Sequence, residues 1–159
     1  MKSTGEAIGY DRKLSRAMYK ALIASGVKMQ NYGTVIVTLA DEDKEDALPL
    51  IKRFYNMGFN IEATAGTGEF LKANGVRTRI RGKLSEGSTE ILDVIRAGYA
   101  SYVINTRAIM SGIHYEDGIA IRRCATENNV TMFTSLDTVR VLLDVLEEIT
   151  ISVSAIDEE

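Results

Sequence analysis

The sequence lacks the features on which several common classes of protein depend. Cys124 is its only cysteine, so no disulfide can form within the chain, and no cysteines or histidines have the paired spacing of a zinc site. No apolar run approaches the roughly 20 residues that cross a bilayer, and residues 1–10 lack the apolar segment of a signal peptide. We therefore expect a soluble, cytoplasmic protein that binds no metal and enters no membrane.

An excess of positive charge is also absent. The 159 residues include 19 Lys and Arg against 22 Asp and Glu, which gives a formal net charge of −3. Because a nucleic-acid surface needs many basic residues gathered on one face, this balance argues against a nucleic-acid partner, and any anion must be bound by a few local groups. The single histidine, His114, lies between Gly112 and Gly118 without an evident partner. We interpret it as a surface loop residue rather than a catalytic base.

Apolar, β-branched runs alternate with helical patterns from Thr34 onward, which is typical of βαβ units and a parallel sheet. The expected strands are Thr34–Leu39, Asn60–Thr64, Arg77–Ile80, Tyr102–Asn105 and Val130–Phe133. Apolar residues at helical spacing fill the connecting segments, and Gly58, Gly75 and Gly98 stand where helices should end. The sequence therefore predicts an α/β fold in three layers, a doubly wound, Rossmann-like sheet of about five parallel strands.

Other segments are less regular. Arg12–Ser25 has the pattern of an amphipathic helix without a preceding strand, and a helix before the fifth strand is expected over Ile119–Ala125. Pro49 falls inside a helical pattern and predicts a kink or a late start, because it removes a backbone donor. Ile149–Val153 is expected to be a β-prone tail.

One loop has the composition of an anion site. Ligands of open parallel sheets bind beyond the carboxyl ends of the strands, and Thr64-Ala65-Gly66-Thr67 leads from the second strand into a helix. A helix N-terminus offers free backbone N–H groups and a positive dipole end. Gly66 would let the backbone approach an anion closely, and Thr64 and Thr67 add hydroxyl donors. An ordinary helix cap by Thr67 is the alternative interpretation of the same residues.

Further polar residues are expected at the same edge of the sheet. Lys44, at the start of a helix, and Lys83, beyond the third strand, would neutralise a bound phosphate. Thr38 lies near the end of the first strand, and Asn105-Thr106-Arg107 lies at the end of the fourth. The pattern alone supports a phosphate site and a set of unrelated surface residues about equally. We find no catalytic set among the remaining residues.

Several segments resemble a known family. Lys2–Gly9, which reads KSTGEAIG, is similar to the segment that closes the second ATP-grasp half of carbamoyl-phosphate synthetase large subunits. The chain from about Gly33 to Leu146 resembles their terminal methylglyoxal-synthase-like domain. The segments that carry this likeness are Ala63–Thr67, Val103–Thr106, Ile121–Arg123 and Thr134–Thr138. The resemblance implies three parts: the end of an ATP-grasp region with a linker helix (1–30), a regulatory domain (31–147) and a C-terminal tail (148–159).

The resemblance also implies a function. In the synthetases this domain binds UMP or IMP and alters glutamine-dependent carbamoyl phosphate synthesis for pyrimidine and arginine biosynthesis. The positions that match the effector site are Thr38, Lys44, Thr64, Thr67, Lys83 and Asn105, with Gly66, Thr106 and Arg107 beside them. Because Arg107 replaces a threonine of the enteric pattern, the preferred base stays open. The domain itself would use no cofactor, whereas the parent enzyme uses ATP with Mg or Mn.

Other partners and one other activity follow from the same likeness. Phosphoribosyl pyrophosphate is a further effector, and ornithine would be bound near Thr134. The protein partners implied are the rest of the large subunit and the glutamine amidotransferase small subunit, with self-association left open. A methylglyoxal synthase acting on dihydroxyacetone phosphate is the alternative, but that family carries its base in a Gly-Pro-x-Gly-Gly-Asp stretch, where this chain has residues 83–87, KLSEG. A purely structural oligomerisation domain is a third interpretation.

Overall fold

A single parallel sheet organises the chain. The computed structural model describes residues 14, 16–24, 26–27, 29–84, 87–106 and 113–157, with the side chains of 113–116 and 150–157 left out. The strands are β1 (Thr34–Thr38), β2 (Asn60–Thr64), β3 (Thr78–Arg81), β4 (Ala100–Asn105) and β5 (Thr131–Phe133). They lie in the order β3-β2-β1-β4-β5, and all four pairings are parallel. The predicted five-stranded α/β sheet is confirmed, with strand limits that differ from the expected ones by at most two residues.

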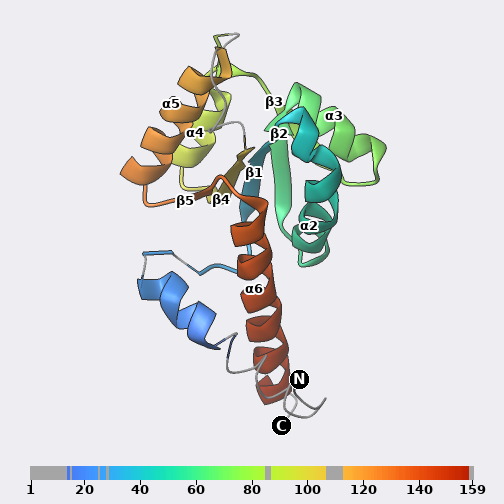
Figure 1. Ribbon diagram of the computed structural model, residues 1–159, viewed down its shortest axis with the longest axis vertical. Coiled ribbons are helices and arrows are strands. Elements are labelled where there is room, and N and C mark those ends of the chain that lie inside the picture. Colours follow the sequence, from blue (N-terminus) through green and yellow to red (C-terminus); the bar gives the residue numbers. More distant parts are fainter. Residues whose placement is uncertain are drawn as a thin grey trace.

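Helices cover the sheet from two sides. They are the short 3₁₀ turn η1 (Asp41–Asp43), α2 (Lys44–Asn56), α3 (Ala65–Ala73), α4 (Glu90–Arg96), α5 (Ile113–Glu127) and α6 (Leu136–Asp157). In Figure 1, α4 and α5 lie on one side of the sheet, and α2 and α3 lie on the other. The buried residues form two clusters, one on each side of the sheet. One cluster is shared by α2, α3 and α6, and the other is shared by α4 and α5. None of the described helices is both long enough and apolar enough to span a bilayer.

Strand β1 is the centre of the structure. Its alternate side chains Val35 and Val37 belong to the cluster of α2, α3 and α6, and Ile36 belongs to the cluster of α4 and α5. All five residues of the strand are buried. A strand covered on both faces needs apolar residues at every position, which explains the continuous run in the sequence.

The α2–α6 contact includes a salt bridge. Arg53 of α2 donates to Glu147 (2.8 Å) and Asp144 (2.7 Å) of α6. This hydrogen-bonded guanidinium lowers the pKa of the Glu147 carboxyl, and the two carboxylates raise the pKa of Arg53. Asp144 lies between the buried Leu143 and Val145, and Glu147 follows the buried Leu146, so these ion pairs border the apolar contact between the two helices.

Two expectations about helices were wrong, and one of the two alternatives expected at Pro49 is absent. Ile149–Val153 is not a β-prone tail, because α6 continues through it to Asp157. Once the buried face of α6 is packed, each further residue extends a helix that already exists, and this outweighs β-propensity. Helix α2 has no late start: it begins at Lys44 and contains Pro49. His114 lies in the first turn of α5 rather than in a loop, because α5 begins at Ile113.

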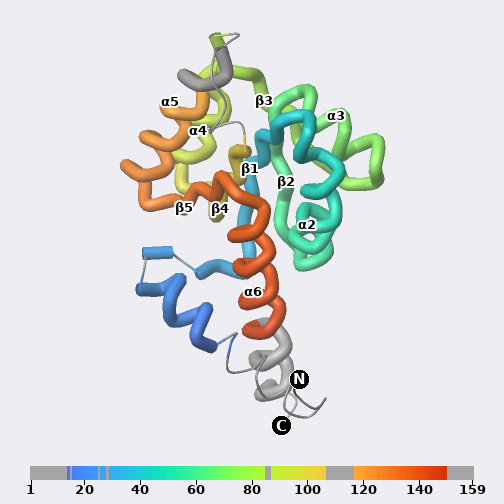
Figure 2. Tube along the Cα trace, in the orientation of Figure 1, coloured from blue at the N-terminus to red at the C-terminus, as the bar shows by residue number. Residues whose placement is uncertain are grey.

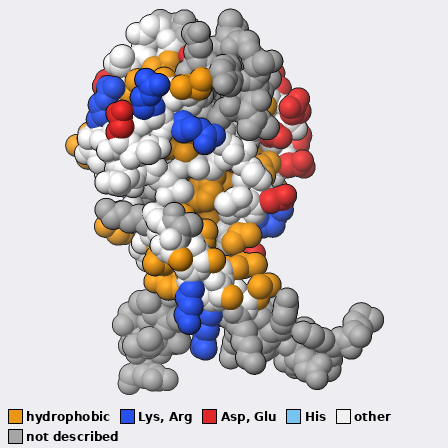
Figure 3. All heavy atoms as spheres, turned by 60° about the vertical axis from the view of Figure 1, so that its left-hand side comes forward, with side chains coloured by type: hydrophobic (Ala, Val, Ile, Leu, Met, Phe, Trp, Pro, Cys, Tyr) orange, Lys and Arg blue, Asp and Glu red, His pale blue; other side chains and the backbone are white. Residues whose placement is uncertain are grey.

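The described residues before the sheet are partly apolar and partly exposed. Residues 16–24 are helical, as the amphipathic pattern predicted, and their path is clear in the trace of Figure 2. Leu22 packs against the cluster of α2, α3 and α6. Leu14, Tyr19 and Ile23 are exposed, and Figure 3 shows hydrophobic side chains at the surface in the lower part of the molecule.

Two glycines of α3 provide a test of the packing between α3 and β3. A Cβ at Gly68 would lie 2.7 Å from Cγ1 of Ile80, whereas a Cβ at Gly66 would meet only the Lys44 ammonium, at 3.8 Å. We predict that Gly68→Ala lowers the free energy of unfolding by about 1–3 kcal/mol through overpacking. Gly66→Ala should leave it unchanged or raise it by up to about 1 kcal/mol, because alanine favours the helix. Urea unfolding of both variants measures the difference, and equal effects would contradict the described contact.

Candidate functional site

The carboxyl ends of three adjacent strands bring polar side chains together. Strand β1 lies between β2 and β4. Thr38, its last residue, is paired in register with Asn105, the last residue of β4. On the other side Val37 is paired with Ala63, so Thr64 at the end of β2 lies level with Thr38. All three residues are at most 6% exposed. The edge of the sheet therefore presents two hydroxyls and an amide within a buried environment.

These side chains contain buried polar atoms that have no hydrogen-bond partner. Within the described part of the chain, such atoms are Thr38 Oγ1, Thr64 Oγ1 and Asn105 Oδ1. A buried polar atom without a partner costs about 1–3 kcal/mol, so proteins rarely retain one without a use for it. Here three such atoms lie at neighbouring strand ends, as expected of a site that receives a polar ligand.

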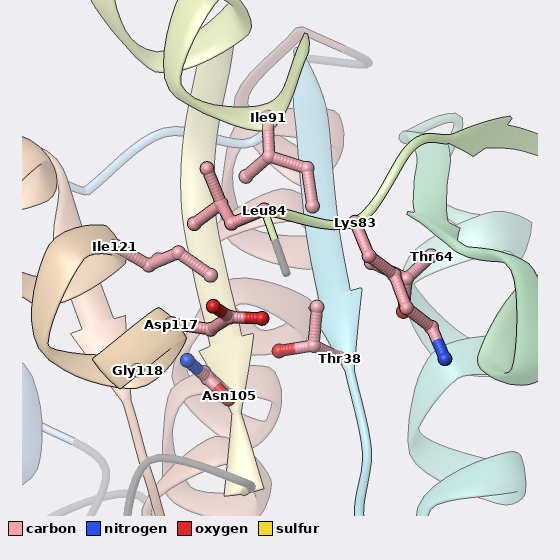
Figure 4. Close-up of a pocket in the computed structure, with 9 residues that line it drawn as sticks. All are labelled: Thr38, Thr64, Lys83, Leu84, Ile91, Asn105, Asp117, Gly118 and Ile121. Carbon is pink, nitrogen blue, oxygen red and sulfur yellow. The ribbon is translucent and has the colours of Figure 1, made fainter. Parts of the chain in front are cut away.

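A small cavity opens where these atoms lie. Its volume is about 30 Å³, and its lining residues are Thr38, Thr64, Lys83, Leu84, Ile91, Asn105, Asp117, Gly118 and Ile121. Figure 4 shows the Asp117 carboxylate directed toward Asn105 and Thr38, and the Lys83 side chain extending beside Thr64. One part of the cavity thus carries a negative group and another part carries a positive group. Apolar side chains from α4 and α5 form its remaining wall.

Two other threonines of this edge already have partners. The backbone N–H of Leu39 donates to Thr67 Oγ1 (3.1 Å), and that of Ala40 donates to Thr106 Oγ1 (2.8 Å). Both threonines are at most 2% exposed. They attach the segment after β1 to α3 and to the end of β4, and each hydroxyl hydrogen remains available to donate. These hydrogen bonds therefore position the segment that follows β1.

Thr67 is not the helix cap that was one interpretation of the sequence. Helix α3 begins at Ala65, and Thr64 is the residue before it, in an extended conformation and without a side-chain cap hydrogen bond. Thr67 lies inside the first turn, where its side chain points back toward β1 to bond Leu39. The first-turn backbone N–H groups of α3 have no intrahelical acceptors, so they can donate to an anion.

The two lysines border the same segment. Lys44 is the first residue of α2, and its ammonium lies 3.8 Å from the position that a Cβ would take on Gly66. The Lys44 side chain is 18% exposed and forms an ion pair with Asp41 (2.7 Å). Lys83 lines the cavity with Thr64. The two positive charges therefore lie at the same edge of the sheet, beside the start of α3.

The remaining predicted residues lie elsewhere. Thr134 is half-buried on the connection between β5 and α6 and does not line the cavity. Arg107 lies outside the described residues. Asp117 was missed, because the helix was expected to begin at Ile119. It precedes Ile121 by four residues on α5, so a helix drawn from Ile113 would have placed both on one face.

Thr-to-Val substitutions can separate the free hydroxyls from the bonded ones. Valine keeps the shape of threonine and replaces the hydroxyl by a methyl group. We predict that Thr38→Val and Thr64→Val leave the free energy of unfolding unchanged or raise it by about 1 kcal/mol, because an unsatisfied polar atom is removed. Thr67→Val and Thr106→Val should lower it by about 1–3 kcal/mol, because the N–H of Leu39 or Ala40 loses its acceptor. Denaturant unfolding without ligand would contradict this assignment if all four variants lost stability equally.

One comparison with known proteins shows the family, and a second shows the fold. The model of the MGS-like domain matches residues 46–134, which is more than half of the chain. The crystal structure of methylglyoxal synthase from Elizabethkingia anophelis superposes with a TM-score of 0.57, over 72% of this chain and 79% of that one. The sequence identity is 17%, so this second likeness concerns the fold. The sheet, its flanking helices and the family match together establish that the chain belongs to the family of MGS-like domains.

Proposed function

We propose that this chain is a regulatory domain of a carbamoyl-phosphate synthetase large subunit that binds a nucleoside monophosphate, UMP or IMP. The observation that carries the proposal is the set of unpartnered buried atoms on Thr38, Thr64 and Asn105 at one edge of the sheet. The likeness of Lys2–Gly9 to the end of an ATP-grasp region supports this parent enzyme over other proteins with an MGS-like domain.

The phosphate would be bound at the start of α3. There the Gly66 backbone and the hydroxyls of Thr64 and Thr67 supply donors, and Lys44 and Lys83 supply positive charge. The Lys44 ammonium already lies against Gly66, with Asp41 as its ion-pair partner. A phosphate is a stronger acceptor than an exposed carboxylate, so it would take over part of this ion pair.

The nucleoside would extend from the phosphate into the cavity. Asp117 and the Asn105 carbonyl can accept hydrogen bonds from hydroxyl or amino groups, and the Thr38 hydroxyl can donate one. Ile91 and Ile121 offer apolar contacts to a planar base. The cavity of about 30 Å³ holds about one water molecule, so a nucleotide must widen it or use the surface around its mouth. Thr106 directly follows Asn105, the last residue of β4. Thr106, and Arg107 as the next residue in the sequence, would influence the choice of base.

Regulation would follow from linkage. An effector changes a distant active site only if it binds two arrangements of the enzyme unequally, so the isolated domain would bind without catalysing a reaction. The partners proposed are the rest of the large subunit, residues 1–30 being the junction to it, and the glutamine amidotransferase small subunit, all in the cytoplasm. ATP and Mg or Mn would act in the parent enzyme alone. Phosphoribosyl pyrophosphate, and ornithine near Thr134, are further effectors to be compared.

The lysines give a direct test of the phosphate site. Titration calorimetry should show that Lys44→Ala and Lys83→Ala each weaken UMP binding about 10- to 150-fold, because each removes a charge-assisted contact of about 1.5–3 kcal/mol. Lys72→Ala, at an exposed position in the last turn of the same α3 helix, is the matched control and should bind normally. Unchanged affinity in both test variants, or an equal loss in the control, would refute the assignment. Parallel titrations with IMP, phosphoribosyl pyrophosphate and ornithine rank the effectors.

A methylglyoxal synthase remains the second candidate because of one observation, the Asp117 carboxylate that faces the cavity. Elimination of phosphate from dihydroxyacetone phosphate needs a carboxylate base beside a bound phosphate. We expect no release of methylglyoxal when the purified chain is incubated with dihydroxyacetone phosphate in a colorimetric assay. Release that disappears in Asp117→Asn would establish the enzyme instead and overturn the regulatory proposal.

A further inference from the structure

Within the part of the chain that the structure describes, half of one face of the sheet has no covering helix. The buried cluster under α4 and α5 takes residues from β1 and β4 and none from β2 or β3. On β2 and β3, Ile61 and Ala63 belong to the opposite cluster, and Ile80 faces Gly68 of α3. The alternate positions, which face the uncovered side, are polar. Parallel sheets are normally covered on both faces, so a bare half-face calls for an explanation.

The polar residues of this half-face line a groove. One part of it, with a volume of about 840 Å³, is bounded by Thr34, Asn60, Glu62, Arg77 and Arg79 together with the end of α2. A second part, of about 450 Å³, shares four of these residues and adds Arg81, Tyr32, Tyr99 and Ser101, among others. The exposed side chains of Tyr32 (69%) and Tyr99 (68%) stand at its border. We call this surface the β3 groove.

The β3 groove is basic although the chain as a whole is acidic. Its lining includes Arg77, Arg79 and Arg81, and Glu62 is the single carboxylate among the described residues that line it. Arg81 forms an ion pair with Glu62. Within the described part of the chain no ion pair is formed by Arg77 or Arg79, and both are exposed. Two guanidinium groups are thus available to an anion that approaches from outside.

The spacing of the arginines favours an extended, acidic segment. Arg79 is the second residue of β3, and Arg77 comes directly before that strand. Residues two apart in an extended chain have side chains on the same face about 6.7 Å apart, and the same spacing holds for a second extended chain laid beside it. Carboxylates at alternate positions of such a segment would meet Arg77 and Arg79 in turn. Small-molecule sites are enclosed and mostly apolar, whereas this groove is open and polar.

We propose that the β3 groove binds an extended acidic segment of a partner protein, with carboxylates at alternate positions paired to Arg77 and Arg79. The exposed tyrosines at its border would contact the same segment, as aromatic residues commonly do at protein interfaces. A nucleic acid fits less well, because the net charge of −3 repels a long polyanion. The proposal does not depend on the effector site, since none of the residues of the β3 groove lines that cavity.

The probe for this test is a fluorescein-labelled peptide in which glutamate alternates with threonine. Its binding to the whole chain is followed by fluorescence anisotropy at low and physiological salt. We expect Arg77→Gln combined with Arg79→Gln to weaken binding about tenfold, a moderate loss because both side chains are solvent-exposed. Neither arginine is in an ion pair, so the double variant should fold, which circular dichroism checks. Arg140→Gln, which changes an exposed arginine of α6 paired with Asp137, is the control and should bind as the unchanged chain does.

Three kinds of result would overturn the proposal. The first is a lack of specificity, seen either as an equal loss of binding in Arg140→Gln or as equal binding of a peptide with the same composition but with its glutamates in one block. The second is tighter binding of a single-stranded RNA of matched length, which would make the surface a nucleic-acid site. The third is self-association in sedimentation velocity that the double variant abolishes, since the occupant would then be a second copy of this chain.

Discussion

The structure depends on the parallel alignment of three strands whose carboxyl ends lie level. Strands β2, β1 and β4 are hydrogen-bonded neighbours, and Thr38 is in register with Asn105. Because parallel strands all point the same way, every polar residue that ends one of them is added to the same edge. Burial of this edge beneath α4, α5 and the start of α3 then deprives its hydroxyls and amide of water. The unsatisfied atoms follow from this burial, and a polar ligand bound at the proposed site would supply their hydrogen-bond partners.

Four threonines at this edge show why a residue type does not determine a role. Thr67 and Thr106 accept hydrogen bonds from backbone N–H groups of the segment after β1, whereas Thr38 and Thr64 have unpartnered hydroxyls. The first pair fixes where that segment runs and therefore where Lys44 begins α2. The second pair has hydroxyls that would be free to bond the ligand proposed above. The rigid pair thus preorganises the open pair, which reduces the entropy that a ligand must overcome on binding.

Local patterns in the sequence were sufficient to predict the sheet, but they could not predict features that depend on tertiary contacts. The continuous apolar run of β1 predicted a strand buried on both faces, and the structure has it. The sequence pattern did not show that α5 begins at Ile113, so Asp117 was missed. Helix α6 continues through Ile149–Val153 although these residues have β-propensity. The pairing of Thr67 with Leu39 joins residues far apart in sequence, and no local pattern encodes it. Arginines occupy alternate positions of β3, which indicates a strand face that is not buried in the core. The strand prediction did not use this pattern.

Electrostatics explains how an acidic chain can offer two separate places to anions. With a net charge of −3, the long-range field does not attract a polyanion, so only close contacts can bind one. The Lys44 side chain is 18% exposed and forms an ion pair with Asp41. This ion pair fixes the position of the ammonium and neutralises part of its charge. Glu62 has the corresponding effect on Arg81 in the β3 groove. In both places one carboxylate orients one cation while a neighbouring cation has no ion-pair partner among the described residues. At the two proposed sites this arrangement would favour small or short anions by geometry and disfavour long ones by net charge.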